Sequence, residues 1–109
     1  MIITLKILNK KYIALAIWPF IFFKSDVYRF DTILINHEKI HLKQQIETGW
    51  LLFFVWYILE FIFRLIQYRN WDTAYRNISF EREAYKYEEN LDYLKNRKNW
   101  GFWRFLKKP

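Results

Sequence analysis

The sequence predicts a small, mainly α-helical protein that associates with a membrane. The chain has 109 residues with only two glycines and two prolines, so helix-breaking positions are rare and no linker to a second domain is present. Hydrophobic residues make up 53% and aromatic residues 23%, yet 27% charged residues keep the mean hydropathy at -0.20. Apolar and charged stretches must therefore be segregated along one domain, residues 1–109.

The absence of cysteine narrows the chemistry further. Without cysteine the chain has no disulfide framework, no thiolate metal ligand and no cysteine nucleophile. The formal net charge of +7 suits an anionic partner, either lipid headgroups or a nucleic acid.

The first thirty residues contain two apolar stretches. Residues 1–8 are rich in β-branched side chains and predict a short N-terminal strand. Residues 12–23 are continuously apolar but include Pro19, which kinks or ends a helix. As a helix this stretch would cover only about 18 Å of a hydrocarbon core of roughly 30 Å. No small-residue cleavage site follows it, so we expect a retained segment that is buried or interfacial.

A helix is expected to begin at Asp31 or Thr32, because either side chain can accept a hydrogen bond from a free amide of the first turn. No helix breaker follows until Gly49, and no strong one until about Asn70. Residues 35–47, INHEKIHLKQQIE, therefore lie on a helix.

Residues 50–68 form the most apolar stretch of the chain, with aromatic residues at both ends. Nineteen helical residues reach about 28 Å, and aromatic rings at both ends are typical of a membrane helix. Glu60 and Arg64 interrupt the run at a spacing that lets them pair. We expect a membrane-embedded helix; a core helix of a soluble domain and a helix lying in the interface are the alternatives.

A last helical region is expected over residues 72–95, with a restart at Ser79 as a helix cap. Helical spacing places one carboxylate, Glu81, in an otherwise apolar stripe, whereas Glu83 points away from it. The stripe consists of Ala74, Ile78, Glu81 and Tyr85. The tail that follows, residues 95–109, mixes aromatic and basic residues, which suits contact with the headgroups of a lipid membrane.

The chain contains only two histidines, His37 and His41, and Glu38 lies between them. Side chains four positions apart share one face of a helix, so the two imidazoles can bind one metal ion while Glu38 reaches a water on that ion. This HExxH arrangement predicts a zinc site. Two inert surface histidines are the alternative.

A catalytic zinc ion needs a third protein ligand and an open position for water. The chain has no third histidine and no cysteine, so the third ligand must be a carboxylate. The candidates are Glu47, Glu60, Glu81 and Glu83.

The two motifs together resemble the gluzincin metallopeptidases, in which a second helix carries a glutamate ligand in an ExxA pattern. Residues 81–84, Glu-Arg-Glu-Ala, supply that pattern, and Tyr85 follows where the family often has aspartate. The resemblance covers residues 33–86 and is nearest to small membrane-associated forms such as the prenyl-protein and sensor peptidases. It implies that Glu81 is the third zinc ligand and that Ala84 allows close helix contact.

The function expected from this resemblance is hydrolysis of a peptide or protein substrate at a membrane, in a bacterium the inner membrane. Glu38 would act as general base and then as general acid. The oxyanion would need a further donor, and the spacing does not choose among the candidates: Tyr75, Arg76, Arg82 and Tyr85. An edge strand to align the substrate could come only from the first thirty residues.

A non-catalytic zinc-binding membrane protein with a structural or sensing role is the alternative function. A closed structural site would need a fourth protein ligand, for which Glu47 is the candidate. A nucleic-acid partner is not expected, because no known reading motif is present and the apolar run over residues 50–68 would have no purpose.

Overall fold

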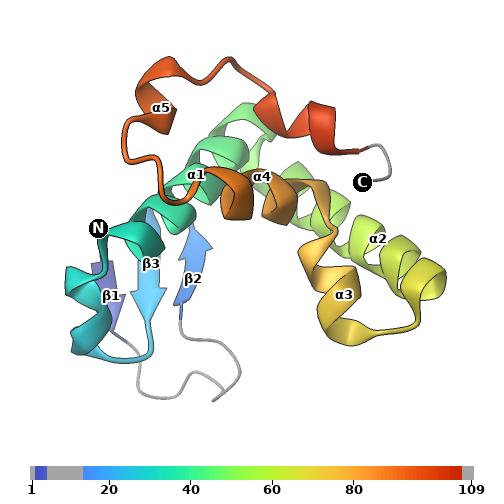
Figure 1. Cartoon of the computed structure of the whole chain (residues 1–109), viewed down its shortest axis with the longest axis horizontal. Coiled ribbons are helices and arrows are strands. Elements are labelled where there is room, and N and C mark those ends of the chain that lie inside the picture. The colour runs from blue at the N-terminus through green and yellow to red at the C-terminus, as the bar shows by residue number, and fades with distance from the viewer. Residues whose placement is uncertain (1, 5–13, 107–109) are drawn as a thin grey trace.

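The computed structural model describes residues 2–4 and 14–106, and it confirms a mainly helical chain with a small N-terminal sheet. Figure 1 shows helix α4 between α1 and the pair formed by α2 and α3. The elements in order are β1 (Ile2–Thr4), β2 (Ala14–Ile17), β3 (Phe20–Phe23), the 3-10 helix η1 (Asp26–Phe30), α1 (Thr32–Thr48), α2 (Trp50–Tyr68), α3 (Trp71–Arg76), α4 (Ser79–Tyr87), α5 (Tyr93–Asn96) and the 3-10 helix η2 (Gly101–Phe105).

The described part of the apolar stretch over residues 12–23 forms two strands and not a helix. Of the strand predicted over residues 1–8, the described part is β1, which pairs with β3 in parallel. Residues 14–23 form an antiparallel hairpin of β2 and β3, and the sheet order is β1-β3-β2. Pro19 lies in the turn, where its missing N–H costs no strand hydrogen bond. The remainder of residues 1–8, and residues 12 and 13, lie outside the described residues.

One side chain fastens this hairpin to α1. Gln45 donates to the carbonyl oxygen of Ala16 at 2.8 Å and accepts from the backbone amide of Trp18 at 2.6 Å. Because both backbone groups belong to β2 or its turn, the strand is held beside the face of α1 that carries the histidines.

Helix α1 begins as the sequence predicts. Asp31 is its N-cap and accepts a hydrogen bond from the amide of Leu34 at 3.0 Å. Gly49 ends the helix at a φ of 84°, a conformation that favours glycine, and α2 starts at the next residue. The break expected near Asn70 is also present, because Arg69 is left-handed and Asn70 caps α3.

The region expected as one helix over residues 72–95 is three short helices, α3, α4 and α5. A restart at Ser79 is observed, but Ser79 is not the cap. Ile78 occupies that position, and the Ser79 amide and hydroxyl both donate to the carboxylate of Glu60, at 2.5 and 2.7 Å. A contact from α2, distant in sequence, therefore fixes the start of α4.

The largest apolar core joins α2, α4 and η2, and its fully enclosed members are Phe53, Ile78, Phe80 and Phe102. Phe102 shows that the tail folds back onto the protein, although Trp100 and Trp103 remain 40% and 58% exposed. Helix α2 is long and apolar enough to cross a membrane, and only 11% of its apolar window is buried. Among the described residues, α2 therefore contributes Phe53 to the core and leaves most of its apolar surface outside it.

Candidate metal centre

The two histidines lie on the buried face of α1, one turn apart. His37 and His41 are 4% and 5% exposed, and their rings are 4.9 Å apart between centroids. The helix supplies this placement directly, because residues at i and i+4 point the same way. Their Nε2 atoms lie 3.2 Å from each other.

Glu81 on α4 closes the group from the opposite side. Its Oε1 atom lies 3.2 Å from Nε2 of His37 and 3.0 Å from Nε2 of His41. Two ligands held about 2.1 Å from a tetrahedral zinc ion are about 3.4 Å apart, so these separations are close to those of a zinc site. Within residues 2–4 and 14–106 this is the one His, Cys, Asp and Glu group of three whose donor atoms converge in this way.

The outer nitrogen of His41 is held by Gln44. Nδ1 lies 2.8 Å from Oε1 of Gln44, whose amide nitrogen donates to the carbonyl oxygen of Phe80 and to Glu83. Since the amide nitrogen must face those two acceptors, its oxygen faces the ring and Nδ1 carries the proton. The neutral ring then presents a lone pair at Nε2, as a metal ligand must.

The outer nitrogen of His37 faces Glu88, whose Oε2 atom lies 3.3 Å from Nδ1 without forming an aligned hydrogen bond. Glu88 is one turn of α4 beyond Ala84. The aspartate expected next to the ExxA pattern is replaced by Tyr85, whose ring packs 4.5 Å from that of His37. The carboxylate beside His37 is therefore that of Glu88, and not one at position 85.

Protonation of the group follows from its burial and its charges. Burial opposes the charged form of His41, but the charge of Glu81 and its hydrogen bond outweigh burial and raise the pKa of His41 to about 9. Burial likewise opposes ionisation of Glu81, and the two imidazoles nevertheless hold its pKa far below the usual range. A carboxylate with two imidazole nitrogens favours a shared cation, either a proton or a metal ion.

Glu38 is buried beside the group but is not one of its three converging side chains. Burial raises the pKa of Glu38 above its normal value, although both imidazoles oppose the shift. A carboxylate with a raised pKa is a better proton acceptor and donor near neutral pH.

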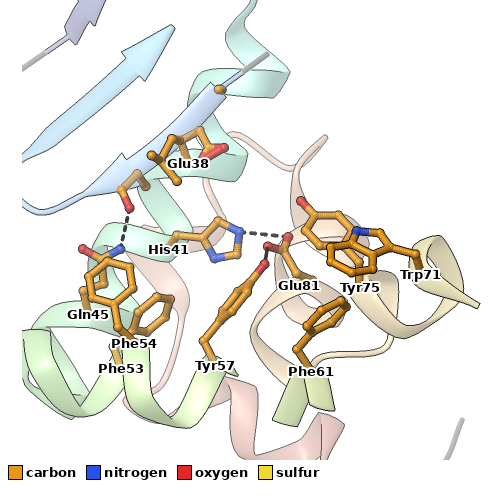
Figure 2. A pocket seen from close by; sticks show the side chains of 13 residues that line it. Glu38, His41, Gln45, Phe53, Phe54, Tyr57, Phe61, Trp71, Tyr75 and Glu81 are labelled. Atoms are coloured by element: carbon orange, nitrogen blue, oxygen red, sulfur yellow. Dashed lines mark hydrogen bonds and ion pairs between the residues drawn. The ribbon is translucent and has the colours of Figure 1, made fainter. Parts of the chain in front are cut away.

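Tyr57 contacts the group and was not among the residues predicted from the sequence. Its hydroxyl donates to Oε2 of Glu81 at 2.6 Å, so both oxygens of that carboxylate have partners (Figure 2). The spacing of Phe53, Tyr57, Glu60 and Arg64 along α2 follows one helical stripe. In the structure three of these four residues are buried, so this spacing could have pointed to Tyr57.

The other candidate carboxylate ligands have different partners. Glu47 pairs with Arg97 at 2.7 Å, and Glu60 binds Ser79. Glu83 points away from the histidines, as its spacing predicts, but it is fully buried and also pairs with Arg97, at 2.5 Å. The structure therefore brings Glu81 to the histidines and places the other three elsewhere.

One of the four candidates for stabilising an oxyanion lies apart, and the other three line a cavity with His37 and Glu38: Tyr75, Arg76 and Tyr85. Arg82 donates to the carbonyl oxygen of Phe105 in η2, on another face of α4. Arg76 lies over the ring of Tyr85, 4.7 Å from its centroid. Tyr75 shares a cavity wall with Glu38 and Glu81 (Figure 2), and its ring lies 6.3 Å from that of Tyr85 between centroids.

Comparison of the chain with protein families, with curated proteins and with solved structures finds no match. The site consequently rests on its own geometry. The buried group of His37, His41 and Glu81 can hold a metal ion.

Proposed function

We propose that this chain is a small, membrane-associated zinc metallopeptidase of the gluzincin kind. One observation carries the proposal: two imidazole Nε2 atoms and a carboxylate oxygen converge within about 3 Å of each other, next to a buried glutamate that is not needed as a ligand. His37, His41 and Glu81 would hold the zinc ion, and Glu38 would carry out proton transfer. A nitrogen and oxygen donor set of this kind suits zinc.

When bound at such a site, zinc lowers the pKa of a coordinated water toward about 7 and polarises a substrate carbonyl. Glu38 takes the proton of the attacking water and later delivers it to the leaving amine. Tyr75 is the best-placed donor for the developing oxyanion, since it lines the same cavity as Glu38 and Glu81. Tyr57 orients Glu81.

The exposed surface of α2 supports the membrane part of the proposal. Nine large apolar side chains of this helix are at least 46% exposed: Trp50, Leu51, Leu52, Val55, Ile58, Leu59, Ile62, Phe63 and Ile66. A continuous apolar surface of this extent is unfavourable in water and marks an interaction site. We propose lipid as its partner, because the helix has nearly the length of a span and aromatic residues at its ends.

The decisive experiment compares two glutamate substitutions in the purified, zinc-loaded protein. Glu38→Gln should retain one zinc ion per chain and lose cleavage of a mixed peptide library, because an amide fills the same space but cannot accept a proton. Glu81→Ala should lose zinc and cleavage together. Equal cleavage by wild type and Glu38→Gln would overturn the peptidase mechanism.

A non-catalytic zinc-binding role is the second candidate. It would be favoured by wild-type protein that holds zinc but cleaves nothing in the library. Among the described residues, the carboxylate expected to close such a site, Glu47, pairs with Arg97 and supplies no fourth ligand. This arrangement supports a position left open for water, as catalysis requires.

A further inference from the structure

Two cavities meet at the candidate metal centre. One has a volume of about 300 Å³ and is lined by His41 and Glu81; the other, of about 500 Å³, is lined by His37. Glu38 and Tyr75 line both. The proposed site of hydrolysis therefore lies where the two cavities adjoin, with room for a polypeptide on either side.

The first cavity is apolar and aromatic. Away from the proposed catalytic groups, its wall is formed mainly by α2, through Phe53, Phe54 and Phe61 (Figure 2). Its volume is at the lower end of the range for ligand pockets, which suits one large side chain. A charged side chain placed there would lose its hydration and find no partner in this part of the wall.

The second cavity carries charge. Its wall, away from the histidine, includes Asp72, Arg76 and Glu88. Glu38 adds a third carboxylate to its border, and Glu81 lies beside His37. These four carboxylates face one guanidinium and the two positive charges of a bound zinc ion, so the local balance still favours a basic over an acidic side chain. Asp72 and Arg76 belong to α3, Glu88 is the C-cap of α4, and none of the charged groups that line this cavity belongs to α2.

From this division we infer the substrate class: an extended polypeptide whose scissile bond separates a large apolar side chain, seated among the phenylalanines of α2, from a basic one, seated against Asp72 and Glu88. The inference rests on the proposed function. It describes a cleavage point where an apolar segment of a protein meets a polar, positively charged one. Such junctions occur where a membrane-embedded stretch leaves the lipid.

The test uses four peptides that differ only at the two central positions: Phe-Lys, Lys-Phe, Phe-Phe and Lys-Lys. Binding is measured in detergent on metal-free wild-type protein, which keeps Glu38 and cannot hydrolyse the peptide. Cleavage is measured on zinc-loaded wild type. One of the two mixed peptides should bind at least about tenfold more tightly than both uniform peptides. The two cavities together form the substrate groove, and only in a mixed peptide can each cavity receive its matching side chain. Both orders are included because the groove walls do not fix the chain direction.

Two variants locate the preference. Phe61→Ala should weaken binding of the preferred mixed peptide about tenfold and leave Lys-Lys binding unchanged. Arg76→Glu should strengthen the preference for lysine and leave Phe-Phe binding unchanged. If Phe61→Ala loses zinc or folds poorly, Phe54→Leu replaces it in the same cavity.

The outcomes separate the inference from the proposed function. Tighter binding of one mixed peptide, without cleavage by wild type, would refute the peptidase function and support the inferred substrate preference of the groove. Cleavage of all four peptides at rates within twofold of each other would support the peptidase and overturn the groove. Binding of either uniform peptide as tightly as both mixed ones would also overturn it.

Discussion

The two long helices of this protein sort their side chains in opposite ways. Helix α1 buries eight residues, of which Ile40 alone has a purely hydrocarbon side chain. Helix α2 buries only Phe53, Glu60 and Arg64 and exposes most of its large apolar residues. An ordinary surface helix of a soluble protein does the reverse, with apolar residues toward the core.

The buried residues of α1 and the exposed residues of α2 depend on different kinds of partner. The polar residues of α1 tolerate burial because partners from distant elements satisfy them, such as Glu81 at the histidines and the β2 backbone at Gln45. The exposed apolar residues of α2, such as Ile58 and Ile66, have no such cover in the described part of the chain. One helix is thus suited to chemistry and the other to a non-aqueous contact.

The largest effect is expected from removing one of the proposed metal ligands from α1. His41→Ala should reduce zinc content from one ion per chain to nearly none, because no other imidazole can replace the lost bond. Gln45→Ala is the matched control: it is one turn further along the same helix and equally buried, but bonds to the strand. Metal analysis of purified protein gives the result, and equal zinc in His41→Ala and wild type would refute the site.

The next largest effect is expected at Glu83, the buried carboxylate that accepts a hydrogen bond from Gln44 of α1. Glu83→Ala should lower the free energy of unfolding by about 3–5 kcal/mol, because Arg97, whose side chain is 1% exposed, loses its closest carboxylate. Chemical denaturation measures this. Glu83→Gln is the control: it keeps an oxygen that can accept from Arg97 and from the Tyr93 hydroxyl, so it should lose less stability than Glu83→Ala. Equal losses for the two variants would contradict this explanation.

Local sequence patterns were enough to predict part of the fold and part of the candidate site. Patterns within one helix were sufficient for α1, for its Asp31 cap, for the convergence of His37 and His41 and for the inward position of Glu81. These depend on periodicity and on local hydrogen bonds, which short stretches determine.

The features that the sequence did not reveal all depend on contacts between distant segments. The hairpin of β2 and β3 needs cross-strand pairing, and the interruption before α4 needs Glu60 of the preceding helix. The roles of Tyr57 and Gln44 appear only once α4 lies against both α1 and α2. Glu83 was correctly oriented by its spacing, but its burial comes from the C-terminal segment.

Two isoleucines, one on each helix, test the proposed contact of α2 with lipid. Ile46 on α1 and Ile58 on α2 are both 56% exposed. Ile58→Asp should weaken membrane association by about 3 kcal/mol, the approximate cost of an aspartate at the centre of a membrane helix. Ile46→Asp should have no such effect. The carbonate-resistant fraction of the protein in membranes measures both, and equal losses would show that α2 has no special contact with lipid.

A smaller effect is expected at the residue that orients His41. Gln44→Met should weaken zinc binding about 10–100-fold without abolishing it, because Nδ1 of the ring loses the acceptor that fixes its tautomer. Competition with a chelator gives the dissociation constants of wild type and variant. Identical constants for wild type and Gln44→Met would assign Gln44 a purely structural role.

The smallest effect is a pH dependence that α1 should have and α2 should lack. The pKa of His41 is about 9 in the metal-free protein, because the opposing effect of burial is outweighed by Glu81. Below that pH a zinc ion must displace the proton, so zinc affinity should fall about tenfold for each pH unit from 8.5 to 7. Calorimetry in two buffers should then record the release of about one proton per zinc. Membrane association should stay constant over this range, since the exposed residues of α2 are uncharged. A zinc affinity that does not change with pH would show that His41 is neutral before the metal binds.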